Sequence, residues 1–208
     1  MTCPGMKETL EIYEQTLRER CNNSSRFACG RAKGCRIHNA MVALCAEMIA
    51  SKLPDIDGQK AYILGLLHDF GKLVYDDEFS DKFHGIEGCR FFLEKGWDEP
   101  ARICLTHSFP DKNIKYSEYP GYSARELRKC KILLAKIDYD DYDRLIQLCD
   151  MLVVGINFTN VKERINFIRN NYKLPLIALK KKYRQALKLK RYFDEKCGCD
   201  IYKLLGVA

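Results

Sequence analysis

The sequence predicts an all-α fold in one domain of 208 residues. Three observations lead to this prediction. Apolar residues recur at helical spacing along most of the chain, and the two-residue alternation typical of strands does not recur. Glycine and proline fall between the periodic segments, as helix-breaking residues should. The chain contains no internal repeat, low-complexity tract or linker long enough to divide it.

The first three predicted helices each carry a continuous apolar stripe that would face the core. They cover residues 6–20, 38–49 and 57–72. The stripes consist of Met6, Leu10, Tyr13 and Leu17 in the first, Met41, Val42, Cys45, Met48 and Ile49 in the second, and Ala61, Leu64, Leu67 and His68 in the third.

Six more helices are predicted over 85–95, 98–107, 123–136, 145–154, 161–170 and 176–196. Ser123 with Glu126, and Asn160 with Glu163, have the spacing of capping pairs that begin a helix. The acidic cluster DYDDYD lacks the spacing of a calcium loop. We expect it to begin the helix that carries Asp150, because carboxylates stabilise a helix N-terminus.

The helix over 176–196 contains seven basic residues in the segment KKKYRQALKLKR. Such a segment is compatible with RNA or an acidic partner. The same helix also predicts a core-facing stripe, so we expect the charges to form its solvent-facing side and nucleic acid binding is not expected. The stripe consists of Leu176, Leu179, Tyr183 and Leu187.

The composition is ordinary for a folded cytosolic protein, with 47% apolar and 30% charged residues. No apolar run approaches the length of a membrane span, and the first residues do not resemble a signal peptide, so we expect a cytoplasmic protein that does not bind membranes. The eleven cysteines are expected to be reduced and mostly buried thiols, because neither Cys29…Cys35 nor Cys197-Gly-Cys199 forms a CxxC zinc framework. The net charge of +7 favours an anionic ligand.

Histidines and aspartates close to apolar segments predict a metal site. The chain has only four histidines, and His68 lies in the pentapeptide HDFGK after the apolar run AYILGLL. Asp150 lies within a second apolar stretch, LIQLCDMLV. Imidazole and carboxylate ligands suit iron, manganese and zinc. The remaining histidines are His38, His84 and His107.

Helical spacing directs two of these histidines toward the core. His38 precedes Met41 and Val42 by three and four residues, and His68 follows Leu64 by four. Asp69 is turned from His68 by about 100° on a helix, so its carboxylate can bind the same ion as the imidazole or a second one. Simple burial does not explain the cluster well, because a buried ionised carboxylate needs a counter-charge.

The ordered pattern resembles the HD-domain superfamily of metal-dependent phosphohydrolases, an all-helical family. Its histidine, its His-Asp doublet and its distant aspartate match His38, His68-Asp69 and Asp150. The resemblance covers about residues 36–155, which leaves helical extensions at both ends. Members with two metals have two further histidines between the doublet and the last aspartate. His84, in HGIEGCRFFLEKG, and His107, in ARICLTHSF, match these positions.

The resemblance implies a divalent transition-metal centre with two ions. His38, His68, Asp69 and Asp150 would hold one ion, and Asp69 would bridge to a second ion held by His84 and His107. We expect iron or manganese before zinc, nickel, cobalt or magnesium. The oligomeric state is left open.

Differences from two subfamilies narrow the expected substrate. The cyclic-dinucleotide HD-GYP enzymes carry a doubled histidine and a glycine-tyrosine-proline signature, whereas His107 is followed by SFPDKN. The guanosine-tetraphosphate hydrolases have an acidic pair shortly after the doublet, where this chain has Gly71-Lys72. The chain is most similar to small bacterial dinuclear members, including hydrolases of diadenosine tetraphosphate.

The expected activity is hydrolysis of a small nucleotide or related phosphate ester by a metal-activated water. Asp69 would hold the metals and orient the nucleophile, and Lys72 would donate to a phosphate oxygen. Arg36 is a candidate for a second phosphate contact. The alternative for both basic residues is solvent exposure, at a helix end for Lys72 and on the surface for Arg36.

Two other functions remain open. HD-fold diiron oxygenases share this ligand pattern, and Lys72 is compatible with either chemistry. A non-catalytic HD signalling module is the third hypothesis. Degenerate modules tend to lose ligands, and this chain retains all of them, so we rank this function last.

Overall fold

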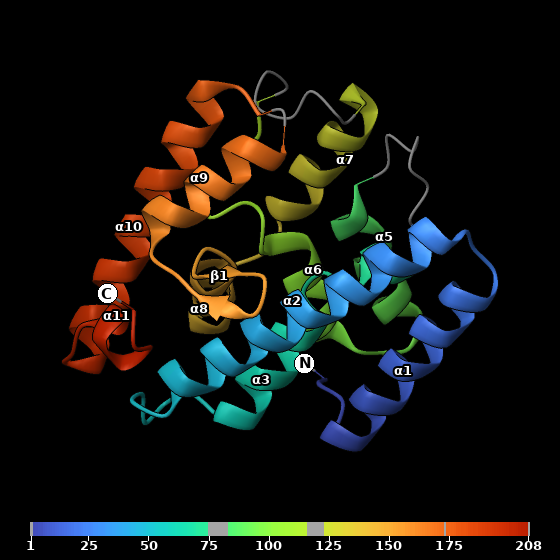
Figure 1. Cartoon of the computed structure of the whole chain (residues 1–208), viewed down its shortest axis with the longest axis horizontal. Helices are drawn as coiled ribbons and strands as arrows, with labels where there is room; N and C mark the ends of the chain where they lie inside the picture. Colours follow the sequence, from blue (N-terminus) through green and yellow to red (C-terminus); the bar gives the residue numbers. More distant parts are fainter. Residues whose placement is uncertain (1, 75–82, 116–122, 173, 208) are drawn as a thin grey trace.

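Helices dominate the computed structural model, which describes residues 2–74, 83–115, 123–172 and 174–207 (Figure 1). The all-α prediction is therefore confirmed. In chain order the elements are α1 Met6–Asn22, α2 Arg26–Ala50, α3 Gly58–Leu67, α4 Gly71–Val74, α5 His84–Glu94, α6 Asp98–Thr106, α7 Ala124–Leu134, α8 Asp141–Asp150, β1 Val153–Val154, β2 Asn157–Phe158, α9 Val161–Asn171, α10 Leu176–Cys197 and α11 Ile201–Leu204.

The predicted helix starts are confirmed by their capping hydrogen bonds. Ser123 accepts from the backbone amide of Glu126 at 3.2 Å, and Asn160 accepts from that of Glu163 at 2.9 Å. The acidic cluster begins α8, because Asp140 accepts from two amides of its first turn. These caps satisfy amides that have no partner within the helix.

The helix predicted over 57–72 is interrupted. α3 ends at Leu67 and α4 begins at Gly71, so the His-Asp doublet lies in the turn between them. Close packing against α5 accounts for the glycine: a Cβ on Gly71 would lie 1.9 Å from the carbonyl oxygen of His84. The turn therefore brings the doublet next to the start of α5.

The helix predicted over 145–154 begins earlier and ends earlier. α8 ends at Asp150, and the chain then forms an antiparallel hairpin in which Val153 pairs with Phe158. Gly155 adopts a positive φ of 60° in the turn, a conformation that glycine reaches without steric cost. This hairpin and α11 were not predicted, because two-residue strands and one-turn helices leave little periodicity.

α2 is the central helix of the packing and contacts α1, α3 and α8 (Figure 1). Its side chains contribute to two buried clusters. One cluster includes Val42, Cys45 and Ile49 with residues of α8 and α10, and the other includes Ala32 and Ala43 with residues of α1 and α3. Loss of water contact by these apolar surfaces is the main force that holds α2 in place.

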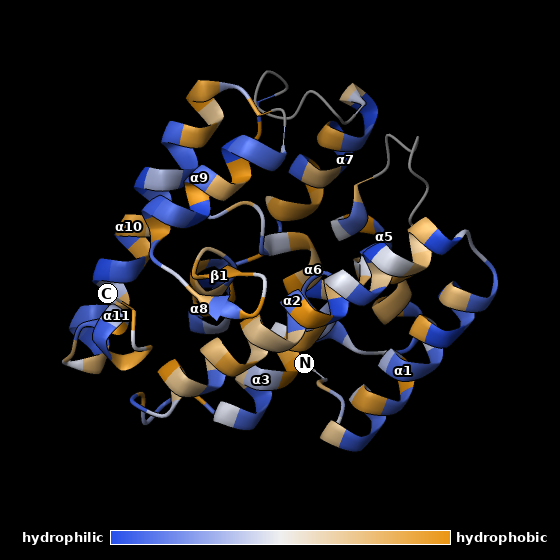
Figure 2. Ribbon diagram, viewed as in Figure 1, coloured by the Kyte–Doolittle hydropathy of each residue, from blue (hydrophilic) through white to orange (hydrophobic). Residues whose placement is uncertain are grey.

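The stripe predicted in α10 is correct except at its first residue. Leu179 is buried, and Tyr183 and Leu187 pack against the core. Leu176 is 66% exposed because it is the first residue of the helix, immediately after its N-cap Pro175. In Figure 2 much of α9 and α10 is coloured hydrophilic, as expected for a charged outer side.

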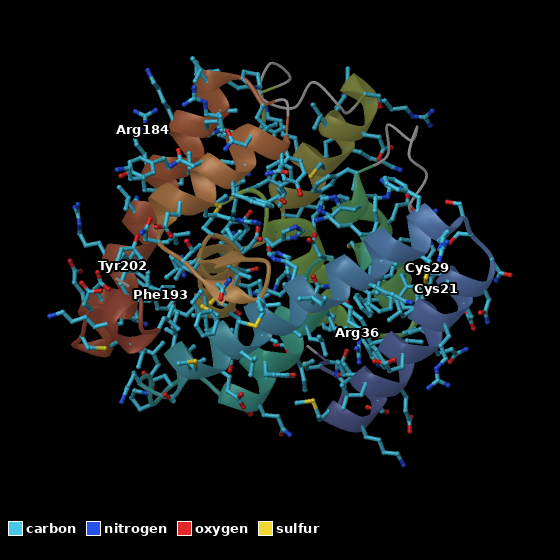
Figure 3. All side chains as sticks on the ribbon, viewed as in Figure 1. Cys21, Cys29, Arg36, Arg184, Phe193 and Tyr202 are labelled. Atoms are coloured by element: carbon cyan, nitrogen blue, oxygen red, sulfur yellow. A yellow bond between two sulfur atoms is a disulfide. The ribbon has the colours of Figure 1, made fainter. Side chains whose placement is uncertain are left out.

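The prediction of reduced thiols is wrong for one pair of cysteines. Cys21 at the end of α1 and Cys29 at the start of α2 form a disulfide (Figure 3). The short turn between the helices brings their Cα atoms to 4.5 Å, which is within the range a disulfide can span. Of the free cysteines, Cys45, Cys104, Cys130 and Cys149 are buried as expected.

Within the described residues, none of the helices combines the length and apolar character needed to cross a bilayer.

Candidate metal centre

Five of the six candidate ligands lie in the middle of α2 or at the ends of four other helices, and Asp69 lies in the turn between α3 and α4. His38 is the internal one, on α2, and His84 is the first residue of α5. His68 and His107 are the C-caps of α3 and α6, and Asp150 is the last residue of α8. Segments far apart in the sequence therefore bring these side chains to one place.

The structure brings five of the six predicted ligands into two groups. His38, His68 and Asp69 offer ligand atoms that all lie within 4.8 Å of one another, and so do Asp69, His84 and His107. Asp69 belongs to both groups. Its Oδ1 lies 3.1 Å from Nε2 of His84 and 3.3 Å from Nε2 of His107. These groups could hold metal, and the shared carboxylate matches the expected bridging arrangement.

Asp150 lies beside the first group and is not part of it within the described residues. Its Oδ1 is 2.9 Å from Nε2 of His38, and the same oxygen accepts from the guanidinium of Arg164 at 2.9 Å. Burial would raise the pKa of Asp150, but Arg164 and then His38 lower it well below its ordinary value. The carboxylate is therefore ionised, and it is held between the imidazole of His38 and the guanidinium of Arg164.

Asp69 is buried as a charged group. Burial would raise the pKa of its carboxyl, but Lys72 and His68 outweigh this effect and hold the pKa well below its ordinary value. Lys72 donates to Oδ2. Oδ1 is buried and has no hydrogen-bond partner among the described residues, although two imidazole nitrogens lie near it. An ionised oxygen in this position is suited to a cation.

His68 is arranged as a neutral ligand. Its Nδ1 lies 2.7 Å from the carbonyl oxygen of Gly65, and because a carbonyl can only accept, Nδ1 carries the proton. Burial lowers the pKa of His68 to about 3, so the ring stays neutral. Its Nε2 is buried without a hydrogen-bond partner among the described residues. A lone pair left in this way is typical of a metal-binding imidazole.

The second group has similar features. Nδ1 of His107 lies 3.2 Å from the carbonyl oxygen of Ile103, which directs its Nε2 toward Asp69. Burial lowers the pKa of His84 to about 4, so this ring is also neutral near pH 7. The Nε2 atoms of His84 and His107 are 3.3 Å apart. Imidazole nitrogens and an ionised carboxylate are the donor set that borderline divalent metals prefer, so the residues fit such an ion.

A pocket of about 510 Å³ adjoins the first group. Its lining comes from α2, from Asp69 and Lys72, from the β1–β2 turn and from the α9 segment with its C-cap. Because three cations outnumber the single carboxylate among its lining residues, it favours an anionic ligand. The cations are Arg31, Lys72 and Arg164, the aromatic residues are Phe167 and Tyr172, and the candidate ligands are His38 and Asp69.

Arg36 is not among the residues that line this pocket. It forms an ion pair with Glu14 of α1, and its side chain is 52% exposed (Figure 3). Its position does not favour the predicted phosphate contact. Arg31 and Arg164 were not predicted, and Arg164 reaches the pocket only through the packing of α9, which no local sequence motif indicates.

A comparison with known protein families finds one match. Residues 4–90 match the family model of the HDOD domain. The chain contains an HD-related domain. The matched part of this HD-related domain includes His38, the His68-Asp69 doublet and His84, and it ends before His107 and Asp150. The resemblance to the HD superfamily seen in the sequence is thereby confirmed. Neither a curated protein nor a solved structure matches the chain.

Proposed function

We propose that this protein is a metal-dependent phosphohydrolase that cleaves a small nucleotide or related phosphate ester. One observation carries the proposal: a buried, ionised Asp69 is shared by two histidine groups beside a cationic pocket. A shared carboxylate suits a two-metal centre, and a cationic pocket suits a phosphate.

In this proposal His38, His68 and Asp69 hold the first ion, and Asp69, His84 and His107 hold the second. Asp150 is the further ligand that the resemblance implies for the first ion. Iron and manganese suit the nitrogen and oxygen donors best, with zinc, nickel, cobalt and magnesium as alternatives. When bound, such ions lower the pKa of a bound water and stabilise charge on the attacking and leaving oxygens.

The side chains around the centre have separate tasks. Lys72 is fixed by its bond to Asp69 and is 44% exposed, so its remaining protons can reach a phosphate oxygen in the pocket. Arg164 neutralises Asp150 and adds positive charge to the same wall. Asp69 keeps its negative charge and can orient a water near the phosphate.

A non-catalytic signalling module is the second candidate, and the HDOD match favours it, because domains of this kind are often signalling modules. The retained ligand residues favour hydrolysis. An HD-fold oxygenase ranks third, since it shares the ligand types and no further observation supports it.

The test begins with elemental analysis of protein purified without oxygen. Up to two transition-metal ions per chain are expected. Each metal-loaded preparation is then incubated with bis(p-nitrophenyl) phosphate, nucleoside mono-, di- and triphosphates and diadenosine tetraphosphate. Product release supports the hydrolase. Substrate-dependent oxygen consumption without phosphate release would indicate the oxygenase, and no turnover with any metal would favour the signalling module.

A further inference from the structure

The wall of the pocket that α9 provides has two chemically different ends. Arg164 binds Asp150 beside His38, so it lies at the end next to the metal centre. Phe167 follows Arg164 by three residues and therefore lies on the same side of α9. The guanidinium carbon of Arg164 is 5.7 Å from the centre of the Phe167 ring. The wall thus places a cationic side chain at the metal centre and an aromatic ring next to that side chain.

Tyr172, the C-cap of α9, is the second aromatic residue that lines the pocket. Its backbone amide donates to the carbonyl oxygen of Ile168 at 2.8 Å, which holds the residue against the end of the helix. The residue is nevertheless 56% exposed. An exposed tyrosine and a partly buried phenylalanine therefore line the same pocket, and aromatic rings can bind a flat ligand group.

The size of the pocket suits a ligand larger than a phosphate. A volume of about 510 Å³ is within the range of sites that bind whole small molecules. Small residues at three lining positions leave room for such a ligand. They are Ala32 and Gly34 on α2 and Gly155 in the hairpin turn.

We propose that Phe167 and Tyr172 form an aromatic subsite that holds the base of a nucleoside phosphate. The phosphate would lie at the metal end, near Lys72 and Arg164, and the base would stack on the rings of α9. Stacking on an aromatic side chain tolerates different bases, so the subsite selects an aromatic group and not one particular base. The position of the phosphate in this inference rests on the proposed function.

The test compares two ligands that differ in the base alone. Adenosine 5′-monophosphate and ribose 5-phosphate are titrated into the 208-residue chain by calorimetry, after chelation and after manganese reconstitution. Saturation-transfer NMR records contact with the base protons. We expect the adenosine compound to bind about tenfold more tightly or better, with strong transfer to its base protons.

Variants of Phe167 and Tyr172 test whether these two rings cause the difference in affinity between the two ligands. Phe167→Ala and Tyr172→Ala should each weaken the adenosine compound about tenfold and leave ribose 5-phosphate unchanged. Phe167→Leu preserves apolar volume, so the fold is maintained, and it should show the same loss. Leu176→Ala is the matched control, because Leu176 is an exposed apolar residue four positions after Tyr172 in the sequence and is not among the residues that line the pocket.

The outcomes separate this inference from the proposed function. Ring-dependent binding without cleavage of any phosphoester would support the subsite and contradict the hydrolase. Cleavage of phosphoesters with equal affinity for the two ligands would contradict the subsite alone. The subsite is also wrong if the adenosine compound binds in neither metal state, or if its binding is insensitive to both aromatic variants.

Discussion

Nε2 of His38 lies 2.9 Å from Oδ1 of Asp150, although 112 positions separate the two residues in the sequence. The contact joins the middle of α2 to the end of α8. Arg164 donates to the same aspartate oxygen, so α9 is tied to this point as well. A single carboxylate therefore links the candidate metal centre to the wall of the pocket, and the position of α9 depends on residues near the metals.

Asp69→Asn should reduce metal content and phosphoester turnover together. The change keeps the shape of the side chain and removes the negative charge that both histidine groups share. Elemental analysis and turnover of the same preparation measure the effect. Asp55→Asn, at an exposed position, is the control. An Asp69→Asn protein with two metals and full turnover would refute the central assignment.

Lys72→Ala should cut turnover and leave most of the metal in place. Loss of one donor to the transition state typically costs about 2–4 kcal/mol. Because Lys72 also lowers the pKa of Asp69, metal retention should be tested at pH 8, where the carboxylate is ionised in either protein. Lys129→Ala removes a lysine that is 59% exposed and serves as control. Full activity in Lys72→Ala would mean that the lysine makes no contact with substrate.

His84→Gln combined with His107→Gln should lower the stoichiometry from two ions to one. These two histidines contribute only to the second group, whereas His38 and His68 remain in the first. Elemental analysis after reconstitution measures the ratio. The dinuclear assignment is wrong if the unaltered protein never exceeds one ion under any reconstitution and the double variant binds the same amount.

Gly71→Ala should destabilise the protein by about 1–3 kcal/mol or more, because the new methyl group would overlap the His84 carbonyl. To relieve this overlap, α4 would have to move away from α5. Because α5 begins with His84, the movement should also weaken the second metal site. Gly30→Ala is the matched control on α2: its methyl group meets nothing within 4 Å and should stabilise the helix by about 1 kcal/mol. Urea unfolding of both variants compares the two effects.

Much of the fold could be predicted from the sequence, because long amphipathic helices with capping residues have strong local signals. The start of α8 at the acidic cluster is one example, since Asp140 caps it. The break between α3 and α4 could not be predicted in this way. It depends on the contact between Gly71 and α5, which is a tertiary interaction.

The candidate ligands could be identified from their order in the chain, since the pattern of His38, the doublet and Asp150 is itself specific. The pocket beside them could not be predicted from the sequence. Arg31 and Arg164 carry no motif, and it is the tertiary arrangement of α2 and α9 around the pocket that brings them into one lining with Lys72. Arg36 lies two positions before His38, which turns it by about 200° around α2, and it pairs with Glu14 of α1.

The metal-free protein should lose stability as the pH falls below about 6.5. Burial lowers the pKa of His68 from 6.5 to about 3 in the folded state. The unfolded chain therefore binds a proton at this residue between these two pH values, and the folded protein does not, so acid favours unfolding. From pH 7.5 to pH 5, His68 alone should reduce the free energy of unfolding by about 2 kcal/mol. His68→Gln retains a donor for the Gly65 carbonyl and removes the titrating group. Over the same interval, the free energy of unfolding of this variant should therefore fall by about 2 kcal/mol less than that of the unaltered protein. Urea unfolding of chelator-treated protein at both pH values measures the difference. Equal pH dependence in the two proteins would show that His68 is not held in the buried, neutral form from which we infer its role as a ligand.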